Sequence, residues 1–124
     1  LVRGLTSENA GLLDEALEAY AKAMAQDPSD WAPANNRGLL LLELAQDDDA
    51  KLVDAKATFE EALRRANGKA VEPMLNLALL HGHRKDFAAG IALATSVAQH
   101  PNAGPLKAQA EKMIASMEKA AKQG

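Results

Sequence analysis

Two histidines, His81 and His83, are the side chains in this sequence whose types would most readily bind a metal ion. Residues two positions apart on a helix project about 200° apart, so these imidazoles cannot bind one ion without ligands from elsewhere in the chain. We therefore predict no metal site.

Three consecutive carboxylates, Asp47, Asp48 and Asp49, could suggest a calcium-binding loop. Such loops space their oxygen ligands around a glycine and end on a distal glutamate, and no such glycine follows here. Asp48 or Asp49 is instead well placed to accept hydrogen bonds from the first amides of a helix over 49–66. We predict a helix cap at this point, inside an acidic insertion near 46–51 that lengthens the neighbouring helices by about a turn.

The residue types that could catalyse a reaction form no recognisable arrangement. The chain has no cysteine, which removes thiolate nucleophiles, disulfides and thiolate metal ligands. Ser7, Ser96 and Ser116 have no local nucleophile motif, and the paired carboxylates at 14–15 and 60–61 fall on faces predicted to be exposed to solvent. We expect neither an enzyme nor a bound cofactor.

The composition narrows the classes of partner. Lys and Arg number 14 and Asp and Glu number 17, for a formal net charge of −3, whereas nucleic-acid binders usually carry a basic excess that neutralises phosphates. No apolar run approaches the roughly 18 residues that span a bilayer, and no secretory leader is recognisable. We expect no nucleic-acid partner and no direct membrane span. Because the sequence begins at Leu1 rather than Met, we expect it to be part of a longer or processed protein.

The elements that carry these residues are predicted to be helices. Ala, Leu, Glu, Lys and Gln are strong helix formers and are abundant here, while β-branched residues are scarce. Apolar residues recur with helical spacing, and the prolines fall in first turns or just after helix ends. The expected fold class is all-α, with helices over 1–9, 12–26, 31–46, 49–66, 71–84, 87–99 and 105–122.

One apolar pattern, Ala-x3-aromatic-x2-Ala, occurs twice. Its two copies are Ala16, Tyr20, Ala23 and Ala55, Phe59, Ala62. Upstream, Gly4 and Gly38 stand 34 residues apart, the length of one tetratricopeptide repeat (TPR) unit. These residues, with Pro28 after the first copy, resemble the TPR family, and the resemblance covers roughly residues 1–101. In that family small side chains let paired helices approach closely, and the rings fill the space between successive pairs.

The resemblance implies a TPR-like helical-repeat solenoid in a single domain, 1–124, with about three helix-turn-helix units. Unit one (1–30) is truncated at its N-terminus, and unit two (31–69) contains the insertion. Unit three (70–101) is degenerate, because Ala94 stands where an aromatic residue is expected and Val97 where Ala is expected.

The last predicted helix lies outside the repeats and is expected to cap them, over 103–124. Its apolar stripe is Leu106, Ala110, Met113, Met117 and Ala120. A repeat array needs such a helix to cover its last core and turn a polar face to water. An exposed stripe that binds a partner helix is the alternative.

In the TPR family, ligands bind the concave surface formed by the first helix of each unit. Carried over to this chain, the resemblance implies a groove of leucines with amides set among them. Its residues are Leu5, Asn9, Asn35, Asn36, Leu39, Leu42, Glu43, Glu72, Leu75, Asn76, Leu79 and His83. Asn36 and Asn76 are suited to the backbone of an extended peptide, because an amide both donates and accepts hydrogen bonds. The alternative is that these two amides bond to neighbouring helices and serve the fold.

TPR domains that bind the acidic C-terminal tails of chaperones share a clamp of Lys and Arg residues. The matching positions here are Leu1, Leu5, Asn36, Glu72 and Asn76. Only Asn36 fits the clamp, and the carboxylate of Glu72 would repel the tail. We predict no binding of chaperone C-terminal tails.

The expected function is that of a non-enzymatic scaffold or adaptor, whose groove binds a peptide or helix of a partner protein. The alternative is a self-associating structural module that forms a homo-oligomer through its terminal helices. In style, and in the run Leu75-Asn76-Leu77-Ala78-Leu79, the chain is similar to small TPR proteins of the bacterial envelope. These include lipoproteins of pilus and secretion machines and assembly factors for c-type cytochromes, which implies an assembly role in the periplasm or cell envelope.

Overall fold

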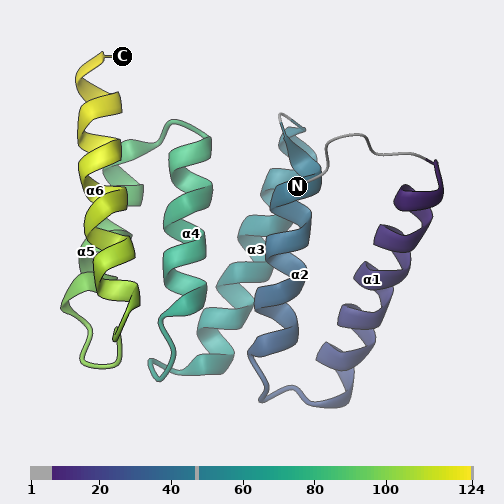
Figure 1. The fold of residues 1–124 in the computed structure, drawn as a ribbon. Coiled ribbons are helices and arrows are strands. Elements are labelled where there is room, and N and C mark those ends of the chain that lie inside the picture. Colours follow the sequence, from purple (N-terminus) through teal and green to yellow (C-terminus); the bar gives the residue numbers. More distant parts are fainter. Residues whose placement is uncertain (1–6, 47, 124) are drawn as a thin grey trace. The chain divides into compact units, whose positions relative to one another are not determined.

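The computed structural model describes residues 7–46 and 48–123, which form six α-helices and no strand (Figure 1). The helices are α1 (Ser7–Gln26), α2 (Ala32–Ala45), α3 (Asp49–Ala66), α4 (Glu72–His83), α5 (Phe87–Gln99) and α6 (Leu106–Gln123). The prediction of an all-α fold is confirmed for this part of the chain. The predicted and observed ends agree within one residue from α2 to α6.

The first helix differs from the prediction. The expected break between helices over 1–9 and 12–26 is wrong, because α1 runs unbroken from Ser7 to Gln26 and includes Gly11. A glycine inside a helix costs about 1 kcal/mol relative to Ala, but it keeps its amide and does not terminate the helix. The residues around Gly11 are good helix formers, and the helix ends only before Asp27 and Pro28.

Side chains and prolines explain where the next helices start. Pro33 and Pro73 occupy the first turns of α2 and α4, where the missing amide has no helical partner to lose. Asp48 Oδ1 accepts hydrogen bonds from the amides of Ala50 (3.0 Å) and Lys51 (3.4 Å) at the start of α3. The predicted cap is therefore confirmed at Asp48, while Asp47 lies outside the described residues. The helices on either side of the acidic insertion, α2 and α3, have 14 and 18 residues, while α1 has 20, so the predicted lengthening by the insertion stays a prediction.

The helices divide into two compact units, residues 1–66 and 67–124, and each is described by itself. In the first unit α2 packs along α3. A Cβ added to Gly38 of α2 would lie 2.5 Å from Cε1 of Phe59, whose side chain is completely buried in α3. The glycine therefore leaves the space that the ring fills.

Helix α1 is the least buried element of the first unit. It packs against α2, yet no residue of 11–26 reaches full burial, and Leu12 is 58% exposed. Leu13, Leu17 and Tyr20 are half-buried on the same helix. An apolar face of α1 is thus only partly covered by the rest of this unit.

The second unit has a core shared by all three of its helices. The buried cluster is Val71, Leu75, Ala78, Ala94, Val97 and Ala110, with Leu106, Met113 and Ile114 of α6 packed against it. Met117 of α6 is 6% exposed, and a Cβ on Gly90 would lie 2.6 Å from its sulfur and 3.1 Å from the carbonyl oxygen of Ala78. The apolar stripe of α6 therefore covers the α4–α5 pair, and α6 is not a free amphipathic helix.

Candidate functional site

The predicted groove residues on α2 are partly accessible. Asn36 and Glu43 are exposed, and Leu39 and Leu42 are half-buried. Asn36, Leu39 and Glu43 follow a spacing of three and four residues, which places them on one helix face. Asn35 is only 7% exposed, so its amide lies inside the unit and offers little surface to a ligand.

The predicted residues on α4 separate into a core residue and a surface stripe. Leu75 is 6% exposed and belongs to the core of the second unit, so its predicted place in a groove is wrong for this structure. Glu72, Asn76, Leu79 and His83 follow one another at intervals of three or four residues and share a face. Leu79 is 45% exposed, while Glu72 and His83 are exposed and Asn76 is half-buried.

Two further predicted residues come from the N-terminal region. Leu5 lies outside the described residues. Asn9 belongs to α1, since this helix begins at Ser7, and not to a separate first helix. The groove candidates whose burial the structure describes thus come from α2 and α4.

A charged pair of α2 and α3 holds these two helices in register beside Asn36. Arg37 donates to the carboxylate of Asp54 (3.3 Å) and to the hydroxyl of Thr58 (2.7 Å). Thr58 is 5% exposed, and its hydroxyl donates in turn to the carbonyl oxygen of Asp54 at 2.8 Å. The side chain of Arg37 bonds to Asp54 and Thr58 of α3. These bonds fix the position of the neighbouring face of α2 relative to α3.

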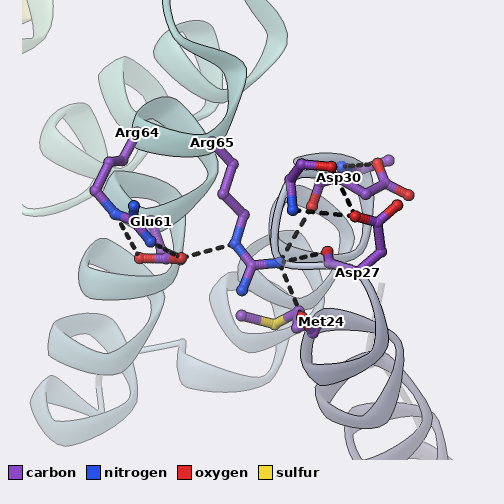
Figure 2. A network of polar contacts seen from close by, with 8 residues as sticks. Met24, Asp27, Asp30, Glu61, Arg64 and Arg65 are labelled. Atoms are coloured by element: carbon purple, nitrogen blue, oxygen red, sulfur yellow. Dashed lines mark hydrogen bonds and ion pairs between the residues drawn. The ribbon is translucent and has the colours of Figure 1, made fainter.

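Sequence reasoning missed the most extensive polar network, which centres on Arg65 of α3 (Figure 2). Its Nη1 donates to the main-chain oxygens of Met24 (3.2 Å), Asp27 (3.4 Å) and Asp30 (3.2 Å). The side chain of Arg65 is 9% exposed, and its Nε donates to Glu61 at 2.7 Å. One guanidinium therefore binds the last turn of α1 and the loop that leads into α2. Its bond to Met24 reaches a carbonyl oxygen that the helix end leaves without an intrahelical partner.

Hydrogen bonds in and beside this network lower the pKa of two carboxylates. Hydrogen bonds from Arg64, and then from Arg65, hold the pKa of Glu61 below its ordinary value of 4.5. In the α1–α2 loop, the Ser29 hydroxyl donates to Asp27 at 2.7 Å and the Ser29 amide at 3.1 Å, and these bonds lower the pKa of Asp27. In their ionised forms, Glu61 accepts a hydrogen bond from Arg65, which contacts the loop, and Asp27 accepts two from Ser29 within it.

The described residues offer no arrangement for metal chemistry or for a membrane span. No group of three or more His, Asp or Glu side chains among them could hold a metal ion, and no described helix is both long and apolar enough to cross a bilayer. His81 is half-buried, and its Nδ1 lies 3.5 Å from a carboxylate oxygen of Asp86. What the site residues can provide is apolar contact and hydrogen bonding.

Similarity to other proteins adds nothing to this description. Comparisons of the chain with known protein families, with curated proteins and with solved structures found no match. The functional assignment therefore rests on the residues and contacts of the chain itself.

Proposed function

We propose that the chain is a TPR-type repeat module that binds partner proteins through the exposed face of α2 in the first unit and that of α4 in the second. Close helix contacts at the positions of the repeat pattern support the architecture. Gly38 faces the ring of Phe59, and Gly90 lies against the backbone of Ala78. The covered apolar stripe of α6 is what a terminal capping helix requires.

The observation that carries the binding function is the surface of α4. Leu79 is 45% exposed and is flanked along the same face by Asn76 and His83. A leucine that is accessible between polar side chains can contribute apolar contact area while its neighbours form hydrogen bonds with a bound backbone. On α2, Asn36 and Leu39 repeat this combination of amide and leucine.

A displayed library of random peptides tests this proposal without a known partner. Peptides are selected on the wild-type chain, and their affinities are then measured for Leu79→Glu and Leu39→Glu. We expect the selected peptides to lose at least about 10-fold in affinity for each variant, which corresponds to about 1.4 kcal/mol. Circular dichroism should show the same helix content for all variants.

Val53→Glu is the matched control, because Val53 on α3 is an apolar residue with 51% exposure and the substitution changes the net charge by the same amount. We expect it to bind the selected peptides like the wild type. Peptides that bind Leu79→Glu and Leu39→Glu as tightly as the wild type would place the binding surface elsewhere and refute the proposal.

The partly covered face of α1 favours self-association as a second candidate function. Leu12 is the most exposed of the large apolar residues in the described chain, whereas the stripe of α6 packs against the core of the second unit. Light scattering across a concentration series should show a mass that rises with concentration, and Leu12→Glu should reduce it. A strict monomer at the highest concentration excludes this candidate.

A further inference from the structure

The two compact units carry formal charges of opposite sign. Residues 1–66 contain 13 Asp and Glu against 7 Lys and Arg, which gives −6. Residues 67–124 contain 4 Asp and Glu against 7 Lys and Arg, which gives +3. The net charge of −3 for the whole chain is therefore the sum of a strongly acidic first unit and a basic second unit. A protein surface with an excess of one sign attracts partners of the opposite sign.

Most of the cations in the first unit are already paired. In the part of this unit that the structure describes, 7–46 and 48–66, six side chains are Lys or Arg. One of them is Lys22, and the other five form ion pairs with carboxylates of the same unit. These five are Arg37, Lys51, Lys56, Arg64 and Arg65. The charge that this part of the unit leaves for a partner is therefore mainly negative.

Glu43 brings this negative charge into the proposed binding surface on α2. Its side chain is exposed, and no ion pair among the described residues includes it. Leu39 and Leu40 precede it by four and three positions, so both lie one turn away on the same side of the helix, and both are half-buried. The other charged residue of α2 is Arg37, which bonds to α3. The exposed face of α2 thus offers two leucines and one carboxylate.

We propose that the partner segment bound on α2 presents a Lys or Arg side chain beside an apolar side chain, with the cation paired to Glu43 and the apolar group in contact with Leu39 and Leu40. This pairing rests on the function proposed above and names the chemistry of the bound segment. An Arg can form two parallel hydrogen bonds with a carboxylate. The apolar contact beside the pair excludes water from one side of it, which strengthens the attraction between the two charges.

The geometry of α2 sets the spacing that the segment needs. At a rise of about 1.5 Å per residue, Leu39 and Glu43 are separated by about 6 Å along the helix axis. Two side chains of a partner reach about this separation when they are four positions apart in a helix, or two positions apart in an extended strand. The expected pattern is therefore an apolar residue with a Lys or Arg two or four positions away.

The surface of α4 does not support the same inference. Its stripe begins at Glu72 and ends at His83, and Arg84 and Lys85 follow directly. Both signs of charge thus occur along this helix and just beyond its end. We expect no preference for basic segments at α4, so the requirement for a cation is specific to the first unit.

The first experiment uses the displayed peptides that lose affinity for Leu39→Glu, since these contact α2. Their sequences should contain the expected pattern. Fluorescence anisotropy with the full chain should show that Glu43→Gln binds them about 3-fold more weakly, as expected for an exposed ion pair, and that Glu43→Lys binds them at least about 10-fold more weakly. A rise in ionic strength should weaken binding to the wild type more than binding to Glu43→Gln.

A charge exchange identifies the pair. A peptide whose basic residue is replaced by Gln should bind the wild type and Glu43→Gln equally, and a peptide with Glu at that position should bind Glu43→Lys more tightly than the wild type. Glu18→Gln is the matched control, because it changes the net charge by the same amount at an exposed residue of the same unit. Glu18 is two positions from half-buried Ala16 and Tyr20 and so lies on the opposite side of α1. We expect this control to change the affinity by less than about 1.5-fold.

The outcomes separate the charge pairing from the proposed function. If no selected peptide depends on Leu39, the binding surface on α2 is refuted and the pairing is refuted with it. If peptides depend on Leu39 but lack the basic residue, or bind Glu43→Gln as tightly as the wild type, the surface stands and the pairing is overturned. Equal effects of Glu43→Gln and Glu18→Gln also overturn it, because they show only the net charge of the unit at work.

Discussion

Replacing Gly38 by Ala tests the closest helix contact of the first unit. The added methyl group would lie 2.5 Å from Cε1, 2.6 Å from Cδ1 and 3.0 Å from Cζ of Phe59. The ring cannot move into solvent, because its side chain is completely buried. Either α2 must shift away from α3 or the ring must leave its preferred rotamer.

The size of the effect follows from two opposing contributions. Alanine is about 1 kcal/mol better than glycine within a helix, which favours the variant. Overpacking a well-filled core typically costs about 1–3 kcal/mol, and a contact to three atoms of a rigid ring lies towards the upper end. We expect a net loss of about 1–2 kcal/mol in the free energy of unfolding of the first unit.

Urea denaturation followed by fluorescence measures this change. Trp31 is the single tryptophan of the chain and precedes α2, so its emission reports on the first unit. At a slope of about 1.5 kcal/mol per molar urea, the midpoint should fall by about 1 M. Gly11→Ala is the matched control, because a Cβ there meets nothing within 4 Å, and it should be neutral or stabilising.

A second substitution identifies the cause. Phe59→Leu removes ring atoms that the new methyl group would touch, so the cost of Gly38→Ala should be smaller in the Phe59→Leu background. The difference between the two costs is the coupling energy of the contact. If Gly38→Ala is as stable as Gly11→Ala, or if its cost is the same with Leu at position 59, the close contact does not limit this unit.

Three other predictions concern the polar side chains. Arg65→Lys should destabilise the first unit by about 1–2 kcal/mol in urea melts, because one ammonium cannot reproduce the contacts of a guanidinium. The control is Arg64→Lys, which alters a side chain that is 70% exposed and should change stability by less than about 0.5 kcal/mol. The pKa of Glu61 is lowered, so the stability that its ionised carboxylate gives to the first unit is complete above the ordinary pKa of 4.5. That stability is lost as the pH falls through the folded-state pKa. Urea melts from pH 7 to pH 2 should show this loss, and Glu61→Gln should weaken the dependence of stability on pH. Asp48→Ala should destabilise the first unit through the lost cap of α3, whereas Asp48→Asn should restore most of the stability. Equal stabilities of these two variants would contradict the capping role.

Local features explain why most of the helices could be predicted from the sequence. Pro33 and Pro73 fix helix starts through the chemistry of a single residue, and Asp48 does so through amides two and three residues away. Gly11 was misleading because glycine weakens a helix in any context but ends one only when its neighbours also disfavour the helix. Helix α1 is continuous because the helix propensities of all its residues add up, and the low propensity of Gly11 alone is too small to end the helix.

The candidate surface was only partly predictable, because burial depends on which helices meet. Asn35 and Asn36 are neighbours of the same type, yet the first is buried and the second exposed, and Leu75 and Leu79 differ in the same way. Periodicity places residues on faces but does not say where a partly covered face ends. The Arg65 network could not be predicted from the sequence for another reason. Its acceptors are main-chain oxygens 35 to 41 positions away, and any residue type supplies such an oxygen.

The division of the helices into two compact units has a consequence for how the chain is made. In each unit the packed helices are neighbours along the sequence or are separated by a single helix, and proteins with such local contacts fold in microseconds to milliseconds. A ribosome adds roughly 5–20 residues per second. Residues 67–124 therefore take several seconds to synthesise, so the first unit has time to fold as soon as it has left the ribosome, before the second unit is complete.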